Sequence, residues 1–459
     1  MIAQPSDNDQ KITLSVARLY ERRPYPHYPL LAKPRWQDGY LMSSLFAQSV
    51  CQSHAIAMKQ AAPAEVRATE ILIAGCGEIL PYLLRKWEPR RCQITAVDLS
   101  RRSLRRARFR LTFNTQPTCF VQSDIVEFLG RCQKEQRFFR HIESYGMFHH
   151  LADPEIAISR AAQQLVAGGT MRAMIYNAEA RRWIHAVQDL FVGLGFSAES
   201  NLHIRRGREI LRQAANLLPR LDYKLKQMGD SVIDNRSRFA DTFLHPHEVR
   251  YDVAQWLTAF AATGLELQGI FDRYGELDDL PNPLYLAPTI AQMSERAADL
   301  RFENNLELYL RRPAPASTSG PPLLSSLTTA TALRLKLPPH LWFSFPETAK
   351  LGLIDRLAIW HGFQSSLATG EKLLPNRFLS LPPRSLQRLS RLGAIHLTQV
   401  PKTLHQTLLD PMVKRLDAPA LPPNKSLAET PLAAILLKQA PTDAAKIKIQ
   451  TALENLSNI

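Results

Sequence analysis

The chain contains the sequence Ile71-Leu72-Ile73-Ala74-Gly75-Cys76-Gly77, in which an apolar run ends in a Gly-x-Gly turn. A second apolar run, residues 94–97, is followed directly by the carboxylate of Asp98. In a parallel βαβ unit, glycines at the turn let the backbone pass close to a ligand, and an acidic residue after the second strand binds ribose hydroxyl groups. The order of these two features therefore predicts a nucleoside-binding site that includes Gly75, Gly77 and Asp98.

Short apolar runs alternate with helical stretches from about residue 66 to residue 177. The expected strands are Glu70–Ala74, Gln93–Val97, Thr118–Gln122, Arg140–Tyr145 and Thr170–Tyr176. The expected helices are Leu80–Trp87, Arg102–Phe113 and Asp153–Leu165. Such alternation predicts an α/β fold with a doubly wound, mostly parallel sheet that has helices on both faces. Ligands bind to such sheets at the carboxyl ends of the strands.

Two more strands are expected later in the chain, at Leu265–Phe271 and Leu306–Leu310, which makes a seven-stranded sheet. An amphipathic helix is expected over 246–263, and Thr263-Gly264 is expected to end it, because glycine is a common helix stop. Residues 281–301 are predicted to be helical.

The predicted organisation has three parts and a linker. An N-terminal helical and Tyr-Pro lid segment covers 1–65, and the α/β domain covers 66–312 with a helical insertion at 178–245. A Pro-, Ala- and Ser-rich linker follows at 313–322. A smaller, mainly helical C-terminal accessory domain is expected over 323–459.

Composition narrows the class of protein. The chain has 459 residues, a formal net charge of +15 and five cysteines. The cysteines form no C-x-x-C pair, which argues against a disulfide framework or a zinc site and favours the cytoplasm. No apolar run is long enough to span a membrane, so no membrane partner is expected. The positive charge leaves nucleic acid open as a partner, although no nucleic-acid motif accompanies it and a solvated basic surface is the favoured interpretation.

Several motifs within residues 66–312 resemble, in order and spacing, those of the class I S-adenosylmethionine (SAM)-dependent methyltransferases. These motifs are Ile71–Gly77, Ala96–Ser100, Gln122–Ile125, Gly146–Pro154 and Leu165–Met171. The segment 239–246 and the Tyr-Pro repeats at 24–29 are similar to one subgroup of these enzymes. The resemblance implies a Rossmann-like methyltransferase that uses SAM and methylates a small molecule or a polypeptide.

The resemblance also implies roles for individual residues. The cofactor-binding residues would be Gly75, Cys76, Gly77, Asp98, Leu99, Asp124, Ile125 and Tyr145. Within this set the glycines would approach the methionine part of SAM, and Asp98 would accept hydrogen bonds from the ribose. Asp124 would bind the adenine amino group, and Leu99 and Ile125 would sandwich the adenine ring.

Methyl transfer requires alignment and a dry cavity more than a fixed set of catalytic groups. Where the acceptor carries a proton, a base must remove it. The candidate catalytic residues are His149, His150 and His245, and the candidate substrate-binding residues are Tyr25, Tyr28, Tyr176 and Asp241. Because adjacent residues on a turn point in different directions, His149 and His150 are not expected to share one role. No metal is expected, and His245-Pro246-His247 is interpreted as the cap of the following helix.

Two departures from the family pattern leave alternatives open. Ile79 stands where the family has a third glycine, and Ile73 stands where an acidic residue is common. A branched side chain at position 79 could crowd the cofactor. The alternatives are therefore a catalytically weakened protein that binds RNA or another protein, and an RNA methyltransferase.

Overall fold

The fold is taken from a computed structural model of the chain. The structure describes residues 6–30, 42–44, 47–48, 50–51, 70–85, 88, 92–112, 118–229, 231–273, 281–285, 305–314, 333–335, 395–397 and 426–458. Most of the predicted linker at 313–322 and most of the predicted accessory domain at 323–459 lie outside these residues. The domain boundaries therefore stay predictions.

An eight-stranded sheet forms the centre of the α/β part, in the order β3-β2-β1-β4-β5-β8-β6-β7. Its strands are β1 (Glu70–Ala74), β2 (Gln93–Asp98), β3 (Thr118–Gln122), β4 (Phe139–Tyr145), β5 (Leu165–Ile175), β6 (Glu266–Arg273), β7 (Pro281–Tyr285) and β8 (Leu306–Arg311). The first five strands run parallel, and β8 pairs antiparallel with both β5 and β6. The predicted doubly wound, mostly parallel sheet is confirmed.

The sheet has one strand more than the seven predicted. Residues 281–285 form β7, which pairs antiparallel with β6, so the prediction of a helix beginning at residue 281 is wrong there. Pairing with a neighbouring strand decides this segment, and a pattern read along one segment does not contain that information.

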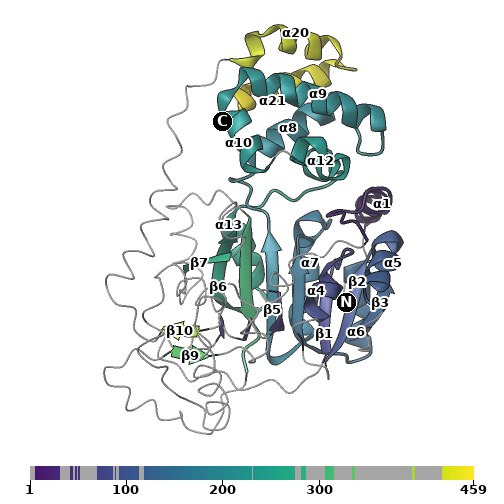
Figure 1. Cartoon of the computed structure of the whole chain (residues 1–459), viewed down its shortest axis with the longest axis vertical. Helices are drawn as coiled ribbons and strands as arrows, with labels where there is room; N and C mark the ends of the chain where they lie inside the picture. Colours follow the sequence, from purple (N-terminus) through teal and green to yellow (C-terminus); the bar gives the residue numbers. More distant parts are fainter. Residues whose placement is uncertain are drawn as a thin grey trace, which may run out of the picture.

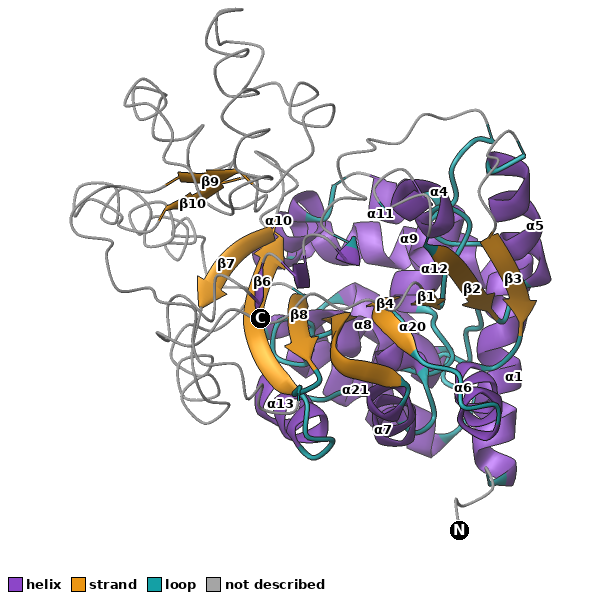
Figure 2. Ribbon diagram, turned by 90° about the horizontal axis from the view of Figure 1, so that it is seen from below, coloured by secondary structure: helices purple, strands orange, loops and turns teal. Residues whose placement is uncertain are grey.

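Helices cover both faces of the sheet, as Figure 2 shows from the end of the strands. The helices are α4 (Leu80–Arg85), α5 (Arg101–Arg110), α6 (Ile125–Lys134), α7 (Pro154–Gln163) and α13 (Val253–Ala261). Side chains of β1 alternate between the faces: Leu72 and Ala74 pack in the core with α6, α7 and α13, whereas Ile71 and Ile73 pack with α4 and α5. Burial on both faces explains why β1 reads as a continuous apolar run.

A helical layer stands at one end of the sheet (Figure 1). It contains α8 (Arg182–Gly193), α9 (Asn201–Leu217), α10 (Pro219–Gln227), α11 (Ser231–Asp234), α12 (Arg236–Phe243), α20 (Pro431–Lys438) and α21 (Asp443–Ser457). The last two helices come from the C-terminal part of the chain and share one apolar core with the insertion. Helix α1 (Asp7–Arg22) lies at the border between the layer and the sheet (Figure 1).

The helix after residue 246 begins later than predicted. Residues 246–252 are not helical, and Asp252 is the N-cap of α13, where it forms a capping box with Gln255. The interpretation of His245-Pro246-His247 as the cap of this helix is therefore wrong. Among the described residues, no helix combines the length and the apolar character that a membrane span requires.

Candidate functional site

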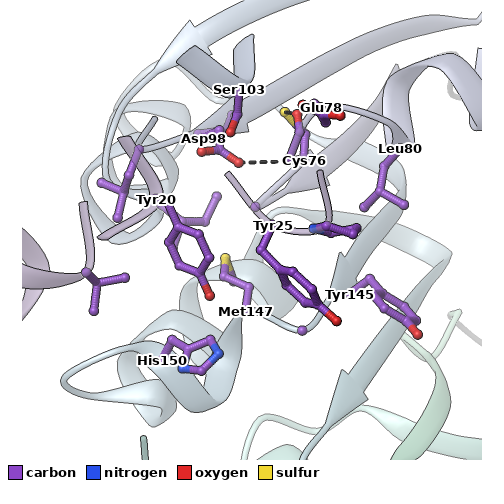
Figure 3. Close-up of a pocket in the computed structure, with 18 of the residues that line it drawn as sticks. Tyr20, Tyr25, Cys76, Glu78, Leu80, Asp98, Ser103, Tyr145, Met147 and His150 are labelled. Carbon is purple, nitrogen blue, oxygen red and sulfur yellow. Dashed lines mark hydrogen bonds between the residues drawn. The ribbon is translucent and has the colours of Figure 1, made fainter. Parts of the chain in front are cut away.

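A cavity of about 350 Å³ opens at the carboxyl ends of β1, β2, β4 and β5. This volume lies within the range of small-molecule sites. Figure 3 shows side chains from α1, from the Tyr-Pro segment and from the strand ends around the same space. Of the sequence-predicted residues, the cavity is lined by Tyr25, Tyr28, Gly75, Cys76, Gly77, Asp98, Leu99, Asp124, Ile125, Tyr145, His150, Tyr176 and Asp241.

The glycine turn and Asp98 are joined directly. Gly75 and Gly77 have φ angles of +69° and +54°, a conformation that L side chains rarely adopt. The backbone N–H of Gly77 donates to Oδ2 of Asp98 at 2.7 Å, and that of Ser100 donates to Oδ1 at 2.8 Å. Burial raises the pKa of Asp98 to about 6, although these two hydrogen bonds oppose the shift. The carboxylate is thus fixed at the pocket wall, and each oxygen has a second lone pair for a ligand.

Ser100 and Asp124 both cap helices at this edge of the pocket. Ser100 is the N-cap of α5, which leaves Asp98 free of that role. Asp124 is the N-cap of α6, and its Oδ1 accepts from the backbone N–H groups of Val126 and Glu127 at 2.7 and 3.1 Å. Because Oδ1 is used for capping, a ligand contact of Asp124 would rely mainly on Oδ2.

The Tyr-Pro segment is tied to the glycine loop through Glu78, which is 1% exposed. The backbone N–H of Tyr28 donates to Oε1 of Glu78 at 2.7 Å. Arg106 and Arg110 of α5 form ion pairs with the same carboxylate, and both donate to the carbonyl of Tyr28. Burial alone would raise the pKa of Glu78, but the hydrogen bonds from Arg106 and Tyr28 lower it. Two arginines of the basic helix α5 are therefore used inside the molecule to hold Tyr25 and Tyr28 over the pocket.

The two adjacent histidines occupy different places. His149 is fully buried behind the pocket wall and stacks on Tyr176 with ring centroids 3.4 Å apart. The other face of the Tyr176 ring lies under the guanidinium of Arg181, 3.6 Å from the ring centroid. His150 lines the cavity instead. The two rings contact each other, with centroids 4.3 Å apart, so the expectation that they point in different directions is wrong. Only His150 reaches the pocket.

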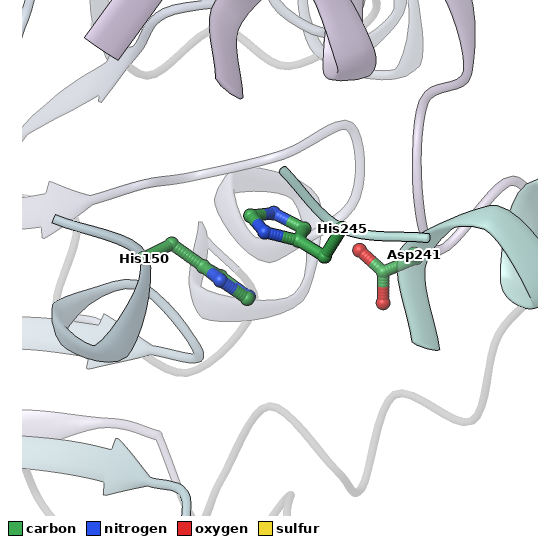
Figure 4. Close-up of side chains that lie close together, drawn as sticks. All are labelled: His150, Asp241 and His245. Atoms are coloured by element: carbon green, nitrogen blue, oxygen red, sulfur yellow. The ribbon is translucent and has the colours of Figure 1, made fainter. Parts of the chain in front are cut away.

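His150, His245 and Asp241 meet at the end of the pocket next to the helical layer (Figure 4). The His150 and His245 rings stack with centroids 3.7 Å apart, and one side-chain N or O atom from each of the three residues lies within 4.8 Å of the others. The hydroxyl of Tyr20 donates to Oδ1 of Asp241 at 2.9 Å. Burial raises the pKa of Asp241 to about 7 and, as the largest cause, lowers the pKa of His150 to about 4.

Behind this cluster, Glu248 forms an ion pair with the buried guanidinium of Arg181. It binds Arg181 through two hydrogen bonds of 2.7 and 2.8 Å and contacts His185 at 2.9 Å. Burial opposes the charge of Glu248, but the charge of Arg181 and its hydrogen bonds keep the pKa well below the usual value. Arg181 is thus already paired and does not form an ion pair with Asp241.

Sequence reasoning missed Tyr20 and Glu78, which both line the cavity. Thr13, Val16 and Tyr20 of α1 also line it, and their spacing of three and four residues could have shown a common helix face. The sequence carries no comparable signal for Glu78, because its role depends on α5 and on the Tyr-Pro segment.

Residues 71–169 match the protein family described as a methyltransferase domain. This match supports a methyltransferase domain in that part of the chain. An uncharacterized protein of Synechococcus sp. is 26% identical over 279 residues, which make up 57% of this chain and 61% of that protein. The match therefore spans less than two thirds of the relative.

Two solved structures are similar at lower identity. PKMT2 from Rickettsia typhi is 11% identical with a TM-score of 0.45, over 78% of this chain and 76% of that chain. The plantazolicin methyltransferase BpumL, in complex with S-adenosylhomocysteine (SAH), is 10% identical with a TM-score of 0.34, over 67% of this chain and 98% of that chain. Among these comparisons, the match of residues 71–169 to a methyltransferase domain is the one that indicates the class of protein.

Proposed function

We propose that the chain is a SAM-dependent methyltransferase that methylates a small molecule or a polypeptide. The observation that carries this proposal is the direct hydrogen bond between the glycine turn and the fixed carboxylate of Asp98 at the pocket wall. The match of residues 71–169 to a methyltransferase domain supports it. The Tyr-Pro segment, which lies over the same cavity, fits the subgroup suggested by the sequence.

The residues at the strand ends fit SAM. Gly75, Cys76 and Gly77 would face its methionine part, and Asp98 would accept hydrogen bonds from its ribose. An added Cβ at Gly77 would meet no atom within 4 Å, so the backbone there is open to a ligand. Leu99, Asp124 and Ile125 would surround the adenine, and Tyr145 would lie near the methyl group. When bound, SAM supplies a methyl carbon already activated for displacement.

The chain's own contribution is alignment and exclusion of water. Helix α1 and the Tyr-Pro segment supply Tyr20, Tyr25 and Tyr28 as walls over the strand ends. Hydrogen bonds from Arg110 to the carbonyls of Tyr28 and Pro29, at 3.1 Å each, hold this cover in place. Of the three candidate histidines, His150 is the one at the cavity and is the one we assign to contact the acceptor.

A second candidate, a catalytically weakened protein, is favoured by one observation. Ile79 is only 5% exposed and lines the cavity, so its branched side chain takes up space beside the glycine turn. If it blocks SAM, the fold serves as a binding module. In contrast, the use of Arg106 and Arg110 inside the molecule removes part of the basic surface that an RNA partner would need.

Calorimetric titration of the full chain with SAM and SAH tests the proposal. We expect both to bind, and Asp98→Ala to weaken binding about 10- to 100-fold, because a hydrogen bond to a charged group contributes about 1.5–3 kcal/mol. Asp222→Ala is the matched control, since Asp222 is a partly exposed carboxylate of α10. Absence of binding by folded wild-type protein would refute the proposal. Binding restored by Ile79→Gly would then establish the weakened protein.

A further inference from the structure

Asp241 is a buried carboxylate that forms no ion pair with any residue the structure describes, and the charges of Arg181 and Arg238 act on it only from a longer distance. It is 6% exposed, it lines the cavity, and Tyr20 donates its single hydrogen bond among the described residues. Within the described ranges no Lys or Arg nitrogen comes within 4 Å of it, and the neighbouring Arg181 is bound to Glu248. A buried carboxylate is costly unless a positive charge or hydrogen-bond donors compensate it. The ligand of this end of the pocket is therefore expected to supply them.

The orientation of His150 adds a second acceptor. Its Nδ1 lies 3.1 Å from the backbone carbonyl of His247, which can only accept, so Nδ1 carries the proton. Burial keeps the ring neutral, and Nε2 is therefore an acceptor. This end of the pocket presents an acceptor nitrogen and a carboxylate, and it suits a ligand that is rich in donors.

A metal ion is the first alternative, because His150, Asp241 and His245 have the ligand types and the separation for one. The hydrogen bonds of His245 argue against it. The backbone N–H of His247 donates to Nδ1 of His245 at 3.2 Å, so the hydrogen of this neutral ring is on Nε2. A metal would need the lone pair of that buried Nε2, which instead offers a donor to its surroundings.

The walls beside Asp241 are aromatic. Tyr20 and Tyr25 line the cavity, and burial raises the pKa of both phenols, so the rings stay neutral. The faces of Tyr176 are already covered by His149 and Arg181, so this ring is not open to a new contact. Of the other cavity tyrosines, Tyr20 contacts Asp241 directly. Aromatic rings near a carboxylate favour an organic cation as the ligand.

We propose that the methyl acceptor is a primary or secondary alkylamine, bound in its protonated form by Asp241 and His150 and bordered by Tyr20 and Tyr25. This inference rests on the proposed function for the reaction but not for the binding. Asp241 takes the proton that the ammonium must lose, because only the free amine has a lone pair to react. In the reaction that lone pair forms the new C–N bond to the methyl carbon while the C–S bond of SAM breaks, its electrons staying on the sulfur of SAH.

The binding test uses n-butylammonium with the full chain, in the presence and absence of SAH, followed by calorimetry or ligand-observed NMR. We expect n-butylammonium to bind at least tenfold more tightly than n-butanol, which has the same shape without the charge. Asp241→Asn should abolish this preference, whereas Asp222→Asn should not. Equal binding of the alcohol and the ammonium, or an unchanged preference in Asp241→Asn, would overturn the proposal.

Three further arms separate the alternatives. A blocked peptide with one lysine, compared with n-butylammonium, shows whether the amine belongs to a polypeptide or to a small molecule. Zn²⁺ binding that excludes n-butylammonium and is lost in His245→Ala would establish a metal site instead. If Asp241→Asn weakens SAM but neither SAH nor n-butylammonium, the carboxylate serves the sulfonium charge and the proposal is wrong.

The Tyr20→Phe variant tests the proposal even if Asp241→Asn does not fold. It removes one donor from Asp241 and leaves the ring in place. We expect n-butylammonium binding to weaken at neutral pH and to recover at higher pH, which a purely structural role of Tyr20 would not produce. Because SAH binding is measured separately, failure of the cofactor to bind would refute the proposed function without deciding the amine site.

Discussion

The two ends of the pocket are built from different kinds of structure. At one end, the backbone of the β1 and β2 strand ends holds Gly77 and Asp98 together, within a short stretch of sequence. At the other end, Tyr20, His150 and Asp241 are side chains brought together from segments far apart in the chain. The first kind of site can be found as a motif. The second depends on how α1 and the helical layer pack on the sheet.

The largest expected effect tests how far the second end depends on the helical layer. Ile449 of α21 is fully buried in the core that α21 shares with the insertion. We expect Ile449→Ala to lower the free energy of unfolding by about 2–5 kcal/mol, the usual cost of truncating a buried isoleucine. Because Asp241 belongs to the same layer, binding of n-butylammonium should be lost at a lower denaturant concentration than binding of SAH.

Ile447→Ala is the matched control, since Ile447 lies on the same helix and is 68% exposed. Circular dichroism during denaturation measures the free energy of unfolding. Titrations with n-butylammonium and SAH at the same denaturant concentrations show when the binding of each is lost. If the two variants unfold alike, α21 does not stabilise the layer. If both ligands are lost together, the two ends are one cooperative unit.

The same contrast explains what could be predicted from the sequence. Strands β1 and β3 have the predicted bounds. For β1 the reason is that a buried strand reads as an apolar run with clear ends. The positions of Gly75, Gly77 and Asp98 at one pocket followed from the order of β1 and β2. Local patterns were thus sufficient wherever the strand or turn itself carries the site.

Tertiary packing decided the rest. Nothing in the sequence near Tyr20 indicates that its hydroxyl donates to Asp241, more than two hundred residues later. That only His150 of the two adjacent histidines lines the cavity depends on the Tyr176 ring, which stacks on His149. The start of α13 is different, because the pair Asp252 and Gln255 is a local capping signal that could have been read.

A smaller effect on stability and on SAH binding is expected from substituting Gly75, at the end of the pocket formed by β1 and β2. Gly75→Ala and Gly264→Ala both place a side chain at positive φ, +69° and +75°, which costs about 1–2 kcal/mol in each case. A Cβ added at Gly75 would also lie 3.0 Å from Cβ of Met147, whereas at Gly264 no atom lies within 4 Å. We therefore expect both variants to lose at least this much stability. Only Gly75→Ala is expected to bind SAH more weakly. Thermal unfolding and calorimetry make the comparison, and equal SAH binding in both would show that the turn tolerates a side chain.

The smallest expected effect concerns the pH dependence of the cofactor end. Burial raises the pKa of Asp98 to about 6, so its carboxylate takes up a proton as the pH falls through that value. The protonated form accepts fewer hydrogen bonds, and we expect SAH affinity to fall about tenfold for each unit below pH 6.

Unfolding would not cause this loss, because protonation relieves the cost of burying Asp98 and so stabilises the folded chain through this group. Calorimetric titrations with SAH between pH 5 and pH 8, at about 0.1 M salt to limit long-range charge effects, give the profile. Asp98→Asn, which cannot titrate, should bind weakly at every pH, whereas Asp241→Asn should keep the inflection of the wild type. An inflection that disappears in Asp241→Asn would mean that the two ends of the pocket titrate as one coupled site.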